Sequence, residues 1–237
     1  MEFHCKQFSL NHTKSSMKIG TDSLLLSSLT PQQNPNKILD IGTGCGIIAL
    51  CMAQKYPNSQ ITAIDIDKNS IEEASDNFKK SKYNTRLIAQ EIDLKTFSRI
   101  QKESFDLIVT NPPYFISSLG SPYENRNKAR HTISLNFQDL IQSAERLLSK
   151  YGILSLILPT IESQIFESIA IEKGIQTIYK ANIYSKQGKE CERVVLHLQR
   201  KQENINNTNI KEEIIILRNP DNTPSQIYQN LVKDYLL

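Results

Sequence analysis

A glycine-rich turn between an apolar strand and an apolar helix is the feature that most constrains the fold of this chain. The strand-like segment Lys37–Asp40 leads to Gly42, Gly44 and Gly46, spaced as G-x-G-x-G, and the helix-like segment 47–56 follows. Glycine permits positive φ angles and lets a ligand approach the backbone closely. The third glycine is misplaced for the dinucleotide fingerprint G-x-G-x-x-G, and the Gly-Lys-Ser/Thr ending of a P-loop is absent. The turn predicts a strand–helix unit of an α/β sheet and does not by itself identify a ligand.

Carboxylates stand where three successive strands are expected to end. Asp40 ends the first strand, Asp65 ends the strand expected over 60–65, and Asp93 ends the strand expected over 85–93. In an open α/β sheet, ligands bind outside the carboxyl ends of the strands, where an acidic residue can hold the hydroxyls of a ribose. Asp65 suits that role, and Asp93 could accept from an adenine amino group. Each residue alone is more often a helix N-cap than a ligand, but together they predict a pocket for adenosine without pyrophosphate.

A tetrapeptide that suits a planar amino group follows a further buried strand. Asn111, Pro112, Pro113 and Tyr114 come directly after the apolar segment 105–110. The Asn111 side-chain oxygen can accept one N–H, and the fixed φ of proline can aim the Pro112 carbonyl at a second. The Tyr114 ring can stack on the flat group. The tetrapeptide predicts a clamp for an exocyclic amine or a side-chain amide, although Asn-Pro is also common turn chemistry.

These residues, in this order, resemble the class I S-adenosyl-L-methionine (SAM)-dependent methyltransferases that methylate amino groups and carry an Asn-Pro-Pro-Tyr motif. The resemblance covers about residues 36–200. It implies an α/β fold with a Rossmann-like, seven-stranded sheet that has one reversed strand and helices on both faces. It also implies SAM across the glycine turn, S-adenosyl-L-homocysteine as the product, and catalysis by the residues 111–114. The residues that we expect to contact the cofactor are Lys18, Gly20, Thr21, Asp40, Gly42, Gly44, Gly46, Asp65, Ile66, Asp93, Leu94 and Asn111.

Segments outside this core narrow the resemblance to one family. Residues 3–8, 17–26 and 126–131 are similar to stretches of the bacterial tRNA (valine) adenine-N6 methyltransferases, which modify the adenine beside the anticodon. The C-terminal segment 214–237 also fits, so the resemblance covers nearly the whole chain. Cys45 stands where many relatives carry Ser, which is of similar size. The resemblance implies a tRNA substrate, and the residues that we expect to contact the RNA are Lys14, Arg126, Lys128, Arg130 and His131.

The length of the chain is that of a single domain. We expect residues 1–237 to form one methyltransferase domain, in which 1–35 is either a frayed terminus or a lip over the substrate and cofactor, 36–200 is the catalytic core, and 212–237 adds a strand and a helix. The segments predicted to be helical are 24–29, capped by Thr21 or Asp22, then 70–81, 137–148 and 224–237. The segments predicted to be strands are 151–158, 177–184 and 192–199, the last two forming a hairpin, and 214–218. His12 and His197 are expected to be structural.

Composition limits the partners and the compartment. The formal net charge of +3 permits an RNA partner without requiring one. The four cysteines form no C-x-x-C pair and have no zinc spacing, so we expect reduced thiols and no metal. The N-terminus lacks a signal-peptide pattern, and no apolar run approaches the ~20 residues that span a bilayer. We therefore expect a cytoplasmic protein with no membrane contact and no obligate protein partner.

Other activities use the same clamp. A glutamine-N5 methyltransferase acting on a release factor would hold an amide in the same way, but that family carries a separate N-terminal helical domain, and only about 35 residues precede the core here. A DNA adenine methyltransferase would usually need an added target-recognition domain. A non-catalytic RNA-binding protein of the same fold is a further alternative, disfavoured by the intact set of clamp, glycine and acidic residues.

Overall fold

The computed structural model describes residues 2–15, 19–102, 104–112, 137–201 and 210–236. Several predicted site residues lie outside the described residues: Lys18, Pro113, Tyr114, Arg126, Lys128, Arg130 and His131.

Strands and helices alternate along most of the described chain. The strands are β1 (Glu2–His4), β2 (Ser9–Asn11), β3 (Lys37–Ile41), β4 (Gln60–Asp65), β5 (Leu87–Glu91), β6 (Phe105–Thr110), β7 (Leu148–Pro159), β8 (Ile175–Lys186), β9 (Cys191–Arg200) and β10 (Lys211–Arg218). The helices are α1 (Thr21–Leu29), α2 (Ile47–Lys55), α3 (Lys68–Lys80), α4 (Leu94–Ile100), α6 (Phe137–Leu147), α7 (Thr160–Glu172) and α8 (Gln226–Val232).

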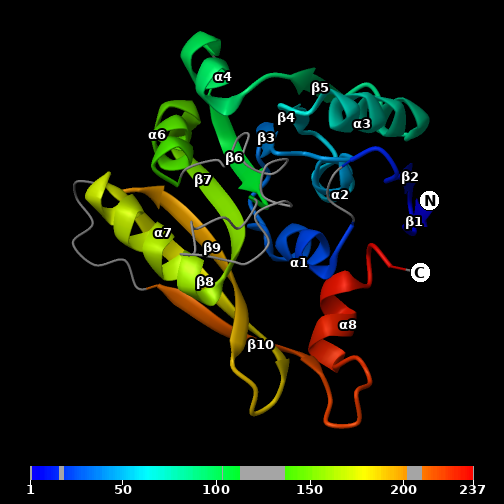
Figure 1. Ribbon diagram of the computed structural model, residues 1–237, viewed down its shortest axis with the longest axis vertical. Coiled ribbons are helices and arrows are strands. Elements are labelled where there is room, and N and C mark those ends of the chain that lie inside the picture. Colours follow the sequence, from blue (N-terminus) through cyan, green and yellow to red (C-terminus); the bar gives the residue numbers. More distant parts are fainter. Residues whose placement is uncertain (1, 16–18, 103, 113–136, 202–209, 237) are drawn as a thin grey trace, which may run out of the picture.

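One twisted sheet forms the centre of the molecule, with the strand order β10-β8-β9-β7-β6-β3-β4-β5 (Figure 1). Strand β9 is antiparallel to both of its neighbours, and the other pairs in this sheet are parallel. The α/β fold with one reversed strand is therefore confirmed. The sheet has one strand more than the seven expected, because β10 pairs in parallel with β8 and buries Ile215 beneath α8 and its neighbours.

Helices cover both faces of the sheet, as expected, and two apolar cores result (Figure 1). Helices α1, α2, α3 and α8 contribute to one core, and α4, α6 and α7 to the other. Within β7, Ile153 and Ile157 belong to the first core, whereas Leu154, Leu156 and Leu158 belong to the second. Because successive strand residues point to opposite faces, a strand covered on both sides reads as a continuous apolar run.

The described part of the N-terminal segment is folded rather than frayed. Strands β1 and β2 form an antiparallel hairpin, and Cys5, Phe8 and Leu10 are buried in the first core. Phe8 packs edge-on against Tyr83, with 6.4 Å between the ring centroids. This hairpin therefore stabilises the chain ahead of the glycine turn.

Most element boundaries differ from the sequence predictions by a few residues, and three of these differences change a predicted cap or length most clearly. Neither Thr21 nor Asp22 caps α1: the N-cap is Gly20, and no side chain caps it. The third strand is shorter than predicted, because the chain leaves the sheet before Asp93 to begin α4. The C-terminal helix is also shorter and begins after Ser225, whose hydroxyl accepts from the Tyr228 N–H.

The structure confirms that His197 is buried in the fold. Its ring stacks on Tyr179, with 4.4 Å between the ring centroids. Burial, aided by the positive charge of Lys55, lowers the pKa of His197 to about 3, so the ring is neutral at physiological pH. Among the described residues, no helix is long and apolar enough to cross a membrane, and no group of three His, Cys, Asp or Glu side chains could hold a metal.

Candidate active site

The glycine loop, residues 42–46, joins β3 to α2 at the carboxyl edge of the sheet. Gly42 and Gly46 have φ angles of 70° and 88°, which favour glycine. A Cβ at Gly46 would lie 2.5 Å from a ring carbon of Phe78, so a side chain there would collide with α3. A Cβ at Gly42 would meet nothing within 4 Å, so this part of the loop is open to a ligand.

The backbone donors of this loop are used within the protein. The N–H groups of Gly42 and Thr43 both donate to the carbonyl of Ile64, at 2.9 and 3.1 Å. The N–H of Gly44 donates to Asp65 Oδ2 at 2.9 Å. A phosphate-binding loop needs several such donors pointing at its ligand. In this conformation these three are already paired, which disfavours a phosphate and agrees with a pocket that takes no pyrophosphate.

Asp40 links the glycine loop to the first turn of α2 by hydrogen bonds. Its Oδ2 accepts from Thr43 Oγ1 at 2.6 Å and from the Ala49 N–H at 3.1 Å. The side chain is fully buried, and this burial raises its pKa to about 7 despite the two hydrogen bonds. Asp40 Oδ1 is buried without a partner among the described residues, so it retains the capacity to bind a donor.

Asp65 lies at the end of β4, where the sequence placed it. Its two carboxylate oxygens accept from the N–H groups of Gly44 and Asp67. A carboxylate has about four lone-pair positions, so two remain for ligand hydroxyls. The next residue, Ile66, is an exposed large apolar side chain and offers a surface on which a flat ring could rest. The structural role of capping α3 falls to Asp67 instead.

Asp93 adopts the structural role that the sequence left open. It is the N-cap of α4, and its Oδ1 accepts from the Thr96 N–H at 2.9 Å. Hydrogen bonds from Thr96 lower the pKa of its carboxyl group. Leu94 is buried in the second core, so its side chain is occupied by packing. The Asp93 side chain is nevertheless exposed, so a ligand can reach it.

The clamp residues Asn111 and Pro112 follow β6 beside the glycine loop. Thr110, the last residue of β6, pairs with Ile41 of β3, and its hydroxyl donates to the Ile41 carbonyl at 2.9 Å. Because neighbouring strands lie roughly 4.8 Å apart, Asn111 emerges next to Gly42. Both clamp residues are buried. The tertiary structure therefore places the clamp and the open part of the glycine loop side by side.

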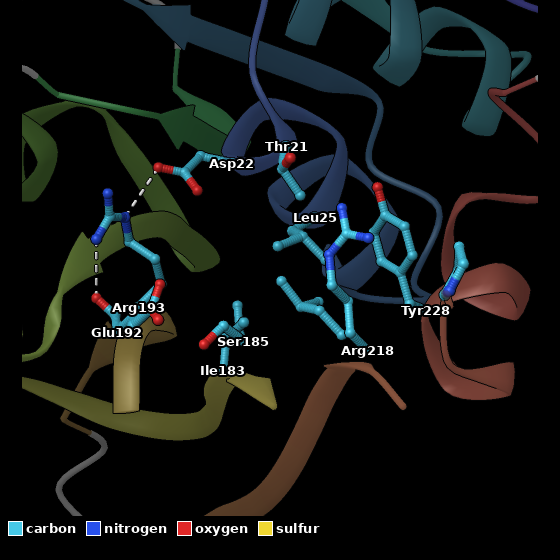
Figure 2. A pocket seen from close by; sticks show the side chains of 11 residues that line it. Thr21, Asp22, Leu25, Ile183, Ser185, Glu192, Arg193, Arg218 and Tyr228 are labelled. Carbon is cyan, nitrogen blue, oxygen red and sulfur yellow. Dashed lines mark hydrogen bonds and ion pairs between the residues drawn. The ribbon is translucent and has the colours of Figure 1, made fainter. Parts of the chain in front are cut away.

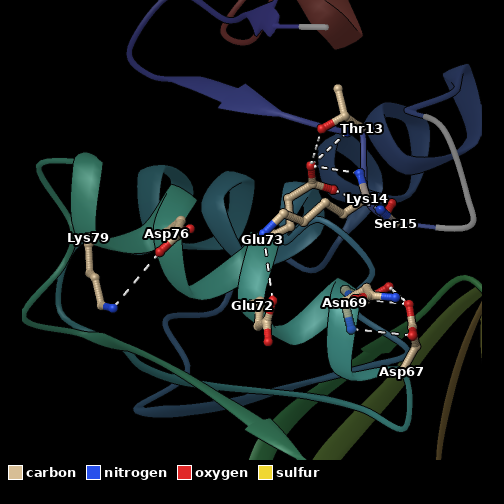
Figure 3. A network of polar contacts seen from close by, with 10 residues as sticks. Thr13, Lys14, Ser15, Asp67, Asn69, Glu72, Glu73, Asp76 and Lys79 are labelled. Atoms are coloured by element: carbon tan, nitrogen blue, oxygen red, sulfur yellow. Dashed lines mark hydrogen bonds and ion pairs between the residues drawn. The ribbon is translucent and has the colours of Figure 1, made fainter.

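A polar network on α3 holds the N-terminal segment over this edge (Figure 3). Glu73 Oε1 accepts from the N–H groups of Thr13 and Lys14, at 2.7 and 3.0 Å, and Oε2 accepts from the Ser15 N–H at 2.9 Å. Burial acts to raise the pKa of Glu73, but these backbone bonds outweigh it and lower the pKa below the usual range. Ser15 Oγ lies 3.8 Å from where a Cβ of Gly44 would stand. The segment therefore touches the glycine loop.

Asn77 makes the second link between these parts. Its amide exchanges two hydrogen bonds with the backbone of Asn11 and donates a third to the Cys45 carbonyl at 2.8 Å. Sequence reasoning missed both Glu73 and Asn77. The available signal was their four-residue spacing on the apolar face of α3, since a polar pair at buried positions needs partners.

The remaining predicted residues of this region make contacts of their own or begin α1. The ammonium of Lys14 pairs with exposed Glu72 at 3.6 Å, while Gly20 precedes α1 and Thr21 is its first residue. Thr21 lines a cavity bounded by α1, α8 and the strands β8, β9 and β10 (Figure 2). Asp22 pairs there with Arg193, at 3.0 Å between Oδ2 and Nε.

The fold and the edge residues define a methyltransferase. Residues 11–181 match the family model of the methyltransferase small domain, so the chain belongs to that family. A solved structure described as a "predicted O-methyltransferase" from Agrobacterium tumefaciens is similar, with a TM-score of 0.69 and 16% identity, over 90% of this chain and 96% of that one. The ribosomal protein L11 methylase of Lactobacillus delbrueckii subsp. bulgaricus has a TM-score of 0.53 and 20% identity, over 76% and 77% of the two chains. At these identities the two structures support the fold alone.

Curated relatives define the family more narrowly. A protein of Photorhabdus laumondii is 36% identical over 99% of this chain and 95% of its own length. A protein of Flavobacterium psychrophilum is also 36% identical, over 99% of each chain. Both are named tRNA1(Val) (adenine(37)-N6)-methyltransferase. The chain belongs to the family of the tRNA1(Val) (adenine(37)-N6)-methyltransferases.

Proposed function

We propose that this protein transfers a methyl group from SAM to the exocyclic N6 of an adenine in a tRNA anticodon loop, beside the anticodon of a valine tRNA. The observation that carries the proposal is the placement of Asn111 and Pro112 one strand away from the open Gly42. Similarity to tRNA adenine-N6 enzymes over 99% of the chain supports the choice of substrate. We place the activity in the cytoplasm, within a single domain formed by residues 1–237.

The described residues fit SAM as the cofactor. Gly42 leaves room for a ligand, Asp65 retains lone pairs for the ribose hydroxyls, and buried Asp40 Oδ1 has no partner among the described residues. We propose that Ile66 packs on the adenine ring and that the exposed carboxylate of Asp93 accepts from its amino group. Gly44, Gly46, Gly20, Thr21, Leu94 and Lys18 complete the proposed cofactor set. SAM supplies a methyl group that its sulfonium makes electrophilic.

The clamp makes the target amine a better nucleophile. The lone pair of an adenine N6 is delocalised into the ring, so it attacks poorly. Acceptors at the Asn111 side chain and the Pro112 carbonyl would hold the two N–H groups and favour a lone pair localised on nitrogen. Positive charge grows on this nitrogen during transfer, so the same acceptors bind the transition state more strongly than the ground state. By analogy with oxyanion-hole donors, this is worth ~3 kcal/mol. The proton can leave to water afterwards.

Residues outside the described part of the chain complete the proposal. We propose that Tyr114 stacks on the target base, Pro113 stiffens the clamp, and Arg126, Lys128, Arg130 and His131 contact RNA phosphates, together with Lys14. A base in an anticodon loop is unpaired, so removing it from its stack costs less than removing it from a duplex.

The test is methyl transfer from labelled SAM to bulk tRNA lacking the modification, with genomic DNA and release factors offered in parallel. The modified residue is then identified by mass spectrometry after digestion. N6-methyladenosine in tRNA alone is the expected result. Label in a release factor would replace the proposal with glutamine methylation, and cofactor binding without transfer to any substrate would favour a non-catalytic RNA-binding role.

A further inference from the structure

The cavity that Thr21 lines lies at the same edge of the sheet as the proposed active site (Figure 2). Its volume is about 260 Å³, close to the lower end of the ~300–1,000 Å³ found for small-molecule sites. Helix α1 contributes Asp22 and Leu25, β9 contributes Arg193, β10 contributes Arg218, and α8 contributes Tyr228. In Figure 2, the Arg218 side chain extends into the cavity from β10 and the Tyr228 side chain from α8.

The sheet order places this cavity on the substrate side of the clamp. Strands β3, β4 and β5, which carry the glycine loop and the acidic residues, lie on one side of β6, and strands β7, β9, β8 and β10 lie on the other. Arg193, near the start of the reversed β9, pairs with Pro159 at the end of β7, so it stands at the same edge as Asn111. Two strand spacings separate β9 from β6 and four separate β10 from it, so Arg193 lies about 10 Å and Arg218 about 19 Å sideways from the clamp.

The charges in the cavity are mixed. Arg193 Nε donates to Asp22 Oδ2 at 3.0 Å, and its Nη1 donates to the Glu192 carbonyl at 2.9 Å. Arg218 Nη1 donates to the Asn222 carbonyl, and within the described part of the chain Arg218 forms no ion pair. Donors and acceptors therefore stand together over an apolar floor that includes Leu25. A phosphate would meet repulsion from the carboxylates, whereas the edge of a base presents both donors and acceptors.

We propose that this cavity receives the base of one unpaired nucleotide in the same RNA loop, about three to six positions from the methylated adenine, and that Arg218 and Tyr228 hold it. The inference rests on the proposed RNA substrate and extends it to a specificity site. Aromatic rings and guanidinium planes are the groups on which proteins stack unpaired RNA bases, and Asp22 and Arg193 can read the base edge. The sideways distance from the clamp equals about three stacked nucleotides for Arg193 and about six for Arg218, at ~3.4 Å each.

The test uses the full-length protein and a synthetic anticodon stem-loop RNA that contains the target adenine. Arg218→Gln and Tyr228→Ala should each weaken RNA binding about tenfold by fluorescence anisotropy, within the range measured for single base–aromatic stacks. Tyr228→Phe keeps the ring and should keep most of the affinity. Lys201→Gln removes one positive charge at the opposite edge of the sheet, where β9 ends, and serves as the matched control.

A second RNA, abasic at the loop nucleotides about three to six positions from the target, identifies the ligand. It should bind the wild-type protein about tenfold more weakly than the intact stem-loop but bind Tyr228→Ala almost as well as the intact RNA does. SAM affinity and thermal unfolding of each variant, measured in parallel, separate this effect from loss of fold. The proposal would be overturned if both cavity variants bound the intact RNA as tightly as Lys201→Gln does. It would also be overturned if the cavity substitutions weakened binding of the intact and the abasic RNA by the same factor.

These outcomes are distinct from failure of the proposed function. If the wild-type protein binds the stem-loop but transfers no methyl group, the enzymatic proposal fails and the anisotropy comparison still decides the cavity. If it methylates the RNA while both cavity variants match the control, the function stands and the base site is refuted. No RNA binding by the wild-type protein would refute the base site outright.

Discussion

Removing the Glu73 carboxylate should detach the N-terminal segment from the glycine loop. This side chain accepts three backbone N–H bonds and one from the Thr13 hydroxyl. Hydrogen bonds to a charged group contribute about 1.5–3 kcal/mol each. Thr13 and Lys14 are exposed, so water replaces most of what they lose, but the Ser15 N–H is buried. We therefore expect Glu73→Ala to cost about 2–4 kcal/mol, and Glu73→Gln, which keeps one acceptor oxygen, about half of that.

The loss should appear first as local opening. Amide hydrogen exchange at Ser15 should accelerate. SAM affinity should fall about tenfold, because a segment whose opening is favoured by ~1.4 kcal/mol is docked in only about one molecule in ten. Glu72→Gln is the matched control: Glu72 is the adjacent acid, is exposed, and makes one surface ion pair with Lys14. Surface pairs of this kind contribute at most about 1 kcal/mol.

The pH dependence of the stability of the wild-type protein tests independently whether the Glu73 carboxylate is stabilising. Because the folded-state pKa of Glu73 is lowered, its contribution is complete above the ordinary glutamate pKa of ~4.3 and disappears as the pH falls through the folded value. The reasoning would be refuted if Glu73→Gln showed the same slow exchange at Ser15 and the same SAM affinity as Glu72→Gln. The network would then be a surface feature without effect on the site.

Three further substitutions test the site itself. Asn111→Ala should abolish most methyl transfer in a single-turnover assay while leaving SAM affinity nearly unchanged, because the side chain acts on the target amine; unchanged turnover contradicts the clamp. Asp65→Ala should weaken SAM binding at least about tenfold by calorimetry, since two hydrogen bonds to ribose hydroxyls are lost; equal affinity would make Asp65 structural. Asp40 has a pKa raised to about 7 by burial, so its contribution to stability is complete below the unfolded-state pKa of roughly 3.9 and declines as the pH rises toward 7. Asp40→Asn should flatten the stability curve over this range in urea unfolding, and an unaltered curve is the result that would argue against a raised pKa.

Local patterns in the sequence were sufficient to predict most elements of the central sheet and the edge on which the proposed site lies, although β1, β2, α4 and α7 were not among the predicted segments. An apolar run ended by Asp or Asn recurs at Asp65 and Asn111, and both residues stand at strand ends in the structure. Parallel strands of a βαβ series share one carboxyl edge, so this pattern is enough to bring residues from distant strands to a common surface. The glycine requirement at Gly46 was also visible, although only the structure shows that Phe78 imposes it.

The sequence alone could not decide which of two roles, helix cap or binding contact, a polar side chain adopts. Asp93 could cap a helix or bind a ligand, and whether it caps depends on where the chain leaves the sheet, which the apolar pattern predicted two residues too late. Thr21 and Asp22 looked like caps because their residue types favour that position. Tertiary contact overrode this preference for Asp22, since Arg193 lies within reach only after the reversed β9 is inserted beside β7.

By itself, the sequence determined the fold class, the glycine loop and the position of Asn111 and Pro112 directly after a buried strand, because burial periodicity and glycine conformation act over a few neighbouring residues. Tertiary structure alone decided the pairing of polar groups far apart in the chain. Glu73 meets Ser15 across 58 residues, and Arg193 meets Asp22 across 171. Such contacts depend on the path of the whole backbone, and a buried carboxylate or guanidinium accepts whichever partner that path supplies.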